Sequence, residues 1–219
     1  RGLVVQFNID EGEKYKFRNF TWEGHSLYET EILENTLNLQ SGDAFSQSGF
    51  DEAVYQNVQS LYMDRGYLYS NIEPSFTPVG DDSLDVHFSI TENNQVYIRN
   101  INIYGNEKTR ENVIRRELDV FPGDLFRRTL LQRSMRKLHV LNYFDPTSLS
   151  PNVVPVDEDE VDLDISLSEK SSDKASANIG FTGIYGMTGG ANIEFNNFFG
   201  MGQMLSFGFD VGTQVSVYN

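Results

Sequence analysis

The last third of the chain, residues 175–218, alternates apolar positions with small or polar ones, and glycine-rich turns interrupt the alternation. In the clearest run, the apolar face of a strand would consist of Leu205, Phe207, Phe209, Val211 and Thr213. The opposite face would carry Ser206, Gly208, Asp210 and Gly212. Period-2 segments of about ten residues predict strands with one apolar and one polar face. The pattern fits lipid-facing strands of a transmembrane barrel and, equally, a half-buried hairpin of a soluble sheet.

The first two thirds of the chain contain an internal repeat. Residues 17–24 (FRNFTWEG) match residues 98–105 (IRNINIYG) at an offset of 81 positions. The same offset pairs Gly42-Asp43 with Gly123-Asp124. Because order, spacing and residue class all agree, we interpret the two copies as the same structural unit.

Each copy predicts the order strand, helix, helix, strand, strand. The first helix would begin near Ser26 or Lys108, and the second would span about residues 50–64 or 128–141, as apolar residues recur there at helical spacing. The second strand would cover about residues 69–78 or 144–154, and the last strand residues 84–90 or 161–167. Helices and sheet each have one apolar face. The expected fold class is therefore α+β, with a two-layer packing in each copy.

The composition restricts the possible functions. The formal charge of −15 argues against nucleic acid as a partner. Cysteine is absent, which excludes disulfides and thiol catalysis, and no apolar run is long enough for a membrane helix. The sequence opens on Arg1 without a signal peptide, which we interpret as a processed or truncated start. Residues 3–9 predict a strand left over from a domain that begins upstream.

No catalytic, cofactor or metal site is predicted. His25, His87 and His139 lack metal-ligand spacing. The acidic pairs in Asp81-Asp82 and in residues 157–160 lie in predicted turns without the pattern of a calcium loop. We therefore expect a binding protein and no enzyme.

Charge is distributed unequally between the two copies. Residues 15–92 hold 3 Lys+Arg against 13 Asp+Glu, whereas residues 95–170 hold 11 against 13. The basic residues of the second copy gather in its helices and include Arg127, Arg128, Arg133, Arg136 and Lys137. They could serve only the solubility of the helices. They could also form a basic surface that meets anionic lipid headgroups or an acidic partner.

A tandem unit of this order, with Gly-Asp between the helices and a helix exit of the form Gly/Asn-Tyr-Leu/Phe, resembles the POTRA domain. POTRA domains precede the barrel in the Omp85 superfamily of outer-membrane proteins. The later segment NFFGMGQ, residues 197–203, resembles the turn between early barrel strands of that superfamily. The resemblance implies tandem POTRA domains, each a three-stranded sheet with two helices, followed by the first antiparallel strands of a transmembrane β-barrel. It implies four parts: the end of a preceding POTRA domain (1–12), two POTRA domains (15–92 and 95–170) and the first three barrel strands (173–219).

The resemblance also implies a function and sites. It implies assembly of proteins into the bacterial outer membrane, with unfolded outer-membrane proteins, accessory lipoproteins and outer-membrane lipids as partners. The segment that would dock an accessory lipoprotein is Arg115, Arg116 and Glu117. The weakly paired first barrel strand would include Ala177, Ile179 and Phe181, and the turn motif would include Asn197, Phe198, Gly200 and Gly202.

Two alternatives stay open. The first is a translocation or secretion pore of the same superfamily, such as the exporters of two-partner secretion. The strand predicted at residues 3–9 favours assembly, because such exporters usually carry two POTRA domains in all. The second alternative is a soluble periplasmic scaffold whose last hairpins form a small sheet.

Overall fold

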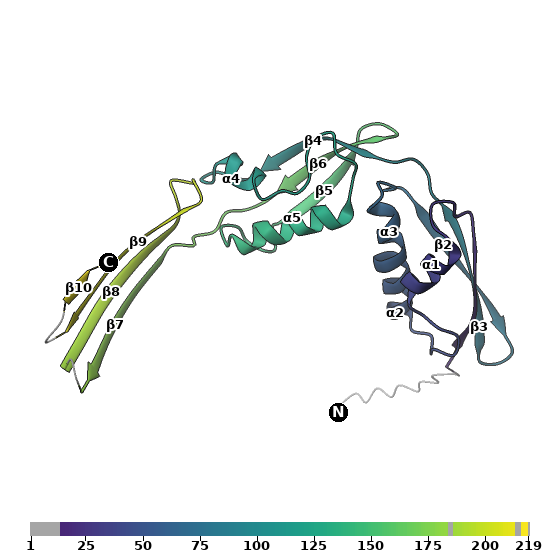
Figure 1. The fold of residues 1–219 in the computed structure, drawn as a ribbon, viewed down its shortest axis with the longest axis horizontal. Coiled ribbons are helices and arrows are strands. Elements are labelled where there is room, and N and C mark those ends of the chain that lie inside the picture. Colours follow the sequence, from purple (N-terminus) through teal and green to yellow (C-terminus); the bar gives the residue numbers. More distant parts are fainter. Residues whose placement is uncertain (1–13, 184–185, 213–215, 219) are drawn as a thin grey trace, which may run out of the picture. The chain divides into compact units, whose positions relative to one another are not determined.

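The computed structural model describes residues 14–183, 186–212 and 216–218. The strand predicted at residues 3–9 and position Thr213 lie outside the described residues. The chain divides into two compact units, residues 1–95 and 96–219. Figure 1 labels the helices and strands of both units.

The first unit is a three-stranded sheet with helices on one face. Its elements are β1 (Lys16–Glu23), α1 (Thr30–Leu37), α2 (Gln47–Asp51), a π-helical segment (Glu52–Val58), α3 (Gln59–Met63), β2 (Asn71–Val79) and β3 (Ser83–Thr91). The strand order is β1-β3-β2, with β1 parallel and β2 antiparallel to β3. The rings of Phe17, Phe50 and Phe88 are buried between sheet and helices. Trp22 stacks on Phe88 with ring centroids 4.1 Å apart.

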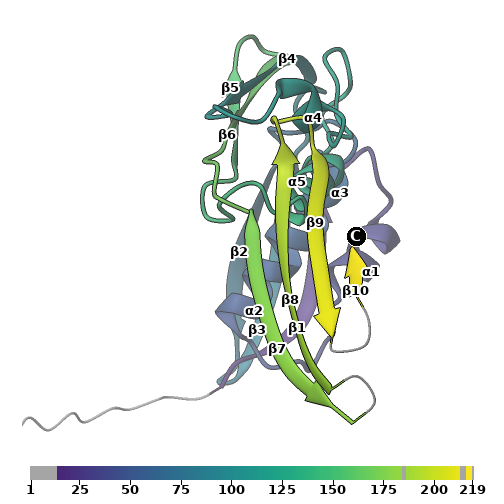
Figure 2. The same ribbon diagram turned by 90° about the vertical axis from the view of Figure 1, so that its left-hand side faces the viewer.

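The second unit repeats this arrangement and adds an antiparallel sheet. Its elements are β4 (Tyr97–Tyr104), α4 (Glu111–Arg115), α5 (Arg128–Val140), β5 (Ser150–Pro155) and β6 (Glu160–Ser166), with strand order β4-β6-β5. The predicted α+β units with three-stranded sheets are thus confirmed. The added sheet consists of β7 (Lys174–Thr182), β8 (Gly186–Phe198), β9 (Gln203–Gly212) and β10 (Ser216–Tyr218), and each strand lies beside the next one in the chain (Figure 2). That these strands open a transmembrane barrel stays a prediction.

The first helix of each repeat starts later than the sequence predicted. A glutamate from the end of the repeat occupies the loop instead. The Glu92 carboxylate accepts hydrogen bonds from the amides of Ser26 and Leu27, at 2.7 and 2.9 Å. In the second repeat the Glu169 carboxylate accepts the amides of Lys108 and Thr109, at 2.7 and 2.6 Å. These amides, which would point along the axis of a longer helix, therefore donate to the glutamate instead.

Two further elements differ from the prediction. The second helix of the first repeat was expected to be one α-helix, but its middle, Glu52–Val58, is π-helical. The strand predicted over residues 144–154 begins only at Ser150. The reason is a turn after Phe144, in which Asp145 Oδ1 accepts hydrogen bonds from the amide and hydroxyl of Thr147. Phe144 itself is buried in the core and forms a single bridge to Glu169.

The Gly-Asp pair shared by the repeats closes part of one sheet edge. The amide of Gly42 donates to the carbonyl of Phe17 at 2.7 Å, and the amide of Phe17 donates to the carbonyl of Asp43 at 2.9 Å. The same two bonds join Ile98 to Gly123 and Asp124 in the second repeat. Gly42 and Gly123 have φ angles of +94° and +91°, which favour glycine. The motif is therefore a backbone clamp on the start of β1 and β4.

Candidate functional site

The open edge of the first repeat is β2, which among the described strands pairs with β3 alone. Pro74 and Pro78 lie in this strand. Proline has no N–H to give to a ladder, so these positions face away from β3. Backbone groups alternate between the two sides of a strand, so the N–H and C=O groups of Ile72 and Phe76 also point away from β3. The edge therefore presents the N–H groups of Ile72 and Phe76 and a row of carbonyls.

The open edge of the second repeat is β5, whose one neighbour within the part of the chain that the structure describes is β6. Here Pro151 and Pro155 mark the outward positions, and Val153 lies between them in the alternation. Only Val153 therefore offers an outward N–H between the two prolines. Pro146 lies in the turn before this strand. The two edges differ in the number of hydrogen bonds that they can offer an added strand.

The β2 edge also carries an aromatic surface. Phe76 is 39% exposed. Its ring centroid lies 5.6 Å from that of Phe45 and 5.0 Å from that of Phe50. A strand placed along β2 would therefore meet an aromatic neighbour on the helix side of the sheet.

The NFFGMGQ segment connects β8 to β9 and docks on the second repeat. Asn197 is only 4% exposed and donates from Nδ2 to Thr109 Oγ1 at 2.7 Å. Its Oδ1 accepts the amide of Gly202 at 2.8 Å, which closes the turn. The carbonyl of Gly200 accepts the amide of Arg110 at 2.9 Å. This docked turn therefore fixes the sheet to the loop that begins α4.

Two glycines let the docked turn approach closely. Gly200 has a φ of +69°, and a Cβ there would lie 1.8 Å from the carbonyl oxygen of Lys108. Gly202 has a φ of +68°, and its Cβ would lie 2.5 Å from Arg116 Nη2. Phe198 lies beside Phe195, with ring centroids 6.3 Å apart. The glycines of the motif therefore serve contact as well as turn geometry.

One face of the added sheet is apolar and exposed. The register places Ala177 opposite Ala191, Ile179 opposite Gly189 and Phe181 opposite Met187. Ile179 and Phe181 are 80% and 77% exposed. The other face is polar, as in the hydrogen bond of 3.0 Å between Ser206 Oγ and Asn192 Oδ1. Because water solvates this apolar face poorly, we expect the face to contact an apolar environment.

The basic residues of the second repeat are partly neutralised within the unit. Asp119 accepts hydrogen bonds of 2.6 Å from Arg133 and from Lys137. These two charged donors, Arg133 first, lower the pKa of Asp119 from its usual value to about 2. Arg127 and Arg136 are exposed at the surface. The predicted basic surface is therefore less positive than its sequence suggests.

The predicted lipoprotein segment meets the basic surface at one groove. Glu117, Arg133, Arg136, Lys137, Val140 and Leu141 line a groove of about 260 Å³. Arg116 Nε contacts the Glu117 carboxylate at 3.3 Å. Arg115 instead bonds Glu111 Oε1 and the carbonyl of Ile101, at 2.7 and 2.8 Å. Glu117 is therefore the member of the predicted segment that lies in the groove.

The histidines belong to small polar clusters. His87 Nδ1 lies 2.8 Å from Thr21 Oγ1, and His25 Nε2 lies 3.0 Å from Thr30 Oγ1. Within the described ranges, no group of three acidic, histidine or cysteine side chains could hold a metal ion. In the same residues, no helix is long and apolar enough to cross a membrane.

Sequence reasoning missed the partners of the docked turn. Thr109 and Glu169 were not predicted as site residues, although both shape the loop that receives Asn197. The repeat offered one signal, because Glu92 stands at the corresponding place in the first copy and caps the corresponding loop. A polar residue kept at the end of both copies indicates a shared structural role.

The chain matches the POTRA family model, described as the surface antigen variable number repeat, over residues 15–93 and 96–170. It is 29% identical over 211 residues to the outer membrane protein assembly factor BamA of Nitratidesulfovibrio vulgaris, covering 94% of this chain and 26% of that protein. It is 28% identical over 202 residues to BamA of Neisseria meningitidis, covering 91% and 25%. The chain thus spans about a quarter of the length of these curated relatives.

Solved structures have the same fold. BamA of Haemophilus ducreyi lacking POTRA domains 1–3 aligns with a TM-score of 0.76 and 19% identity, covering 91% of this chain and 37% of that one. BamA POTRA domains 3–5 of Haemophilus influenzae align with a TM-score of 0.63 and 18% identity, covering 71% and 61%.

Substitution of Gly200 by alanine should undock the turn. The added Cβ would overlap the Lys108 carbonyl, and the positive φ adds backbone strain. We expect the loss of the hydrogen bond to Arg110 and a destabilisation of more than about 2 kcal/mol. Hydrogen exchange of the Arg110 amide measures this, and it should become faster. Gly183→Ala is the control, because no atom lies within 4 Å of its Cβ. Unchanged Arg110 exchange in Gly200→Ala would contradict the docking.

Stability should fall in acid through Asp119. The unfolded chain binds this proton near pH ~3.9, whereas the folded carboxyl has a pKa of about 2. The stabilisation is therefore fully present above pH ~4 and is lost between about 4 and 2. Asp119→Asn should lower the thermal midpoint at pH 6 and flatten its fall below pH ~4. Asp157→Asn, in an exposed turn, is the control. An acid profile of Asp119→Asn that parallels the wild type would refute this role.

Proposed function

The chain belongs to the POTRA family, as its repeat and motif predicted, and from this premise we propose that it is part of an outer-membrane protein assembly factor. The observation that carries the proposal is the continuity of two POTRA repeats with an antiparallel sheet that has one exposed apolar face. The similarity to BamA over most of the chain supports it. The function is binding and insertion of client proteins, with no enzymatic step and no cofactor.

The proposed clients are unfolded outer-membrane proteins, which bind by β-augmentation. In this mode an extended segment adds a strand to an open sheet edge and is held mainly by main-chain hydrogen bonds. Such binding makes little demand on the client's sequence, which suits a factor with many clients. The outward groups of β2 and β5 supply the bonds, and their prolines limit pairing between copies of the chain itself.

The four strands after the second repeat are proposed to open a transmembrane barrel in the outer membrane, with the repeats in the periplasm. Lipid tails would cover the face that carries Ile179 and Phe181, while the polar face would line the lumen. In this proposal β7, with Ala177, Ile179 and Phe181, is the weakly paired strand that client strands meet. Its small residues give little side-chain packing, which suits a strand that opens. The docked turn would transmit the position of the sheet to the second repeat.

A second set of partners follows from the groove at Glu117. We propose that an accessory outer-membrane lipoprotein of the BamD-like kind docks there, with Arg115, Arg116 and Glu117 at the contact. Arg127, Arg128, Arg133, Arg136 and Lys137 form the surface proposed to face outer-membrane lipids or this partner. Each basic residue near an anionic surface contributes about 1 kcal/mol.

The alternatives are less well supported. A soluble scaffold would have to leave the apolar face of β7, β8 and β9 in water, which costs solubility. A secretion pore of the same superfamily would share the fold and differ in its client. Nothing in the described residues favours export over assembly.

Val153→Pro should block β-augmentation on the second repeat without unfolding it. It removes the outward N–H between Pro151 and Pro155 and leaves the ladder to β6 intact. Photo-crosslinking of an unfolded client to β5 should fall several-fold, whereas the thermal midpoint should stay within a few degrees. Asn152→Pro is the contrast, because its N–H points to β6 and its loss should destabilise the unit. Undiminished crosslinking in Val153→Pro would argue against strand addition at this edge.

Glu117→Lys tests the lipoprotein contact. Reversal of this charge places a like charge beside Arg133 and Lys137 in the groove, so co-purification of the lipoprotein should be lost. Glu107→Lys, at an exposed position of the same unit, should leave co-purification intact. Retention of the lipoprotein by Glu117→Lys would contradict the proposed contact.

A further inference from the structure

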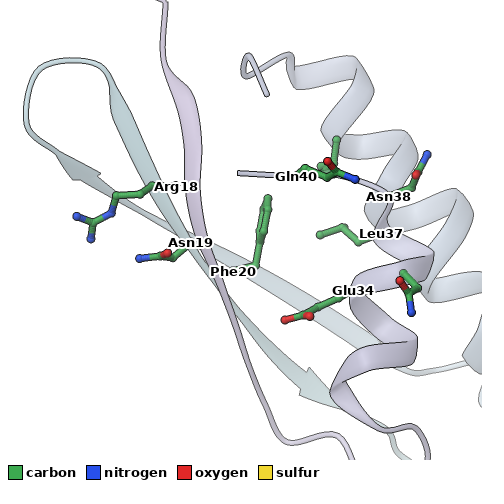
Figure 3. Close-up of a pocket in the computed structure, with 9 residues that line it drawn as sticks. Arg18, Asn19, Phe20, Glu34, Leu37, Asn38 and Gln40 are labelled. Carbon is green, nitrogen blue, oxygen red and sulfur yellow. The ribbon is translucent and has the colours of Figure 1, made fainter. Parts of the chain in front are cut away.

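A groove runs along the other edge of the first repeat, beside β1. It has a volume of about 340 Å³ and is lined by Arg18, Asn19, Phe20, Glu34, Asn35, Leu37, Asn38, Leu39 and Gln40. Figure 3 shows Phe20 pointing from β1 toward the helix, Glu34 reaching back toward the strand, and Arg18 pointing away. Arg18 is held there by hydrogen bonds to Asp85, at 2.7 and 2.5 Å. The guanidinium of Arg18 is thus engaged by Asp85, and Glu34 is the charged side chain that reaches across the groove toward β1.

The edge of β1 is open where the groove lies. The Gly-Asp clamp covers β1 only at Phe17, whose amide and carbonyl face outward to Asp43 and Gly42. The bulge after Phe17 brings Phe20 to the next outward position. Among the described residues, no side chain donates a hydrogen bond to the carbonyl of Phe20. This carbonyl is therefore an available acceptor at the wall of the groove.

The second repeat shows what fits such a place. At the offset of 81 positions, Ile101 corresponds to Phe20 and Arg115 corresponds to Glu34. The Arg115 guanidinium donates to the carbonyl of Ile101 at 2.8 Å and to Glu111 Oε1 at 2.7 Å. The same edge is thus occupied in the second repeat by an arginine from its own helix. A carboxylate and a strand carbonyl hold that arginine.

We propose that the groove of the first repeat binds an arginine side chain of a partner polypeptide that lies extended along β1. Glu34 stands where the second repeat supplies its own arginine, so the first repeat offers the carboxylate and the carbonyl but lacks the cation. The partner's guanidinium donates to the Phe20 carbonyl and pairs with the Glu34 carboxylate. The proposal concerns β1 and does not depend on client binding at β2 or β5.

The chemistry of the groove selects arginine over other side chains. A guanidinium carries five N–H donors in a planar fork, so it can bond a carboxylate and a carbonyl at once. Asn35, Asn38 and Gln40 also line the groove, so its remaining polar side chains are uncharged amides. The excess of 13 acidic over 3 basic residues in positions 15–92 attracts a basic segment. An ammonium group provides the charge without the fork.

The test installs the arrangement of the second repeat in the first. Thr30→Glu with Glu34→Arg places an arginine and its carboxylate at the positions of Arg115 and Glu111. This arginine should occupy the groove and exclude the ligand. Thr30→Glu alone controls for loss of the hydrogen bond between His25 and Thr30. Glu34→Gln removes the charge with little change of shape and decides the matter if the double variant does not fold.

The probe is a blocked hexapeptide of alternating threonine and valine with one central arginine. Matched peptides carry citrulline or lysine at that position. Binding to the whole chain in detergent micelles is measured by calorimetry and by the fluorescence of Trp22, the only tryptophan of the chain. Circular dichroism verifies the fold of each variant.

The arginine peptide should bind the wild type and Thr30→Glu alike. Its affinity should fall about tenfold or more in the double variant and in Glu34→Gln, as expected for loss of a charged hydrogen bond. Citrulline should weaken binding to the wild type by a similar factor, and lysine should weaken it less. Equal affinity of the arginine and citrulline peptides, or of the wild type and a folded double variant, would overturn the proposal.

Discussion

The unpaired backbone at the edges of small sheets is the constraint on which this structure depends. A three-stranded sheet has two edges, and each edge exposes N–H and C=O groups that pair readily with another chain. Each repeat clamps one edge with its Gly-Asp segment, through the carbonyl of Phe17 or Ile98. In each repeat, prolines in the other edge strand, such as Pro74 and Pro151, reduce the number of outward N–H donors. In the proposed function, the part of the edge that remains open accepts a client strand, while the prolines limit pairing between copies of the chain.

A small number of hydrogen bonds also positions the added sheet, through the docked turn. The added sheet exposes its apolar face, so it cannot take its position from a core of its own. Its position on the second repeat is fixed by a few polar contacts around a buried asparagine, Asn197, and by the close approach of Gly200. Buried polar groups that are fully paired specify one arrangement. The joint between the second repeat and the added sheet therefore contains paired polar groups that define its geometry.

The sequence alone predicted much of the fold. The offset between the repeats and the 2.0 and 3.6 periodicities located the two units and their layers. Gly66 and Asn142, which open the Gly/Asn-Tyr-Leu/Phe helix exits of the two copies, have positive φ angles of +88° and +59°. Long-range polar contacts were not predictable, because Glu92 and Glu169 cap loops more than 60 positions away. For the same reason the predicted starts of the first helices, near Ser26 and Lys108, were wrong, because the helices begin at Thr30 and Glu111. The hydrogen bond from Arg115 to Ile101 was also not predictable, because its acceptor is a backbone carbonyl that no residue type reveals.

Depletion of the protein in its native host tests the central claim most directly. The measurement is the amount of folded, heat-modifiable β-barrel protein in isolated outer membranes, followed as the protein disappears. We expect a fall in many unrelated barrel proteins at once, with unfolded clients accumulating in the periplasm, and recovery when the wild-type gene is restored. Normal levels of barrel proteins, together with loss of a single exported protein from the medium, would contradict it and indicate a secretion pore.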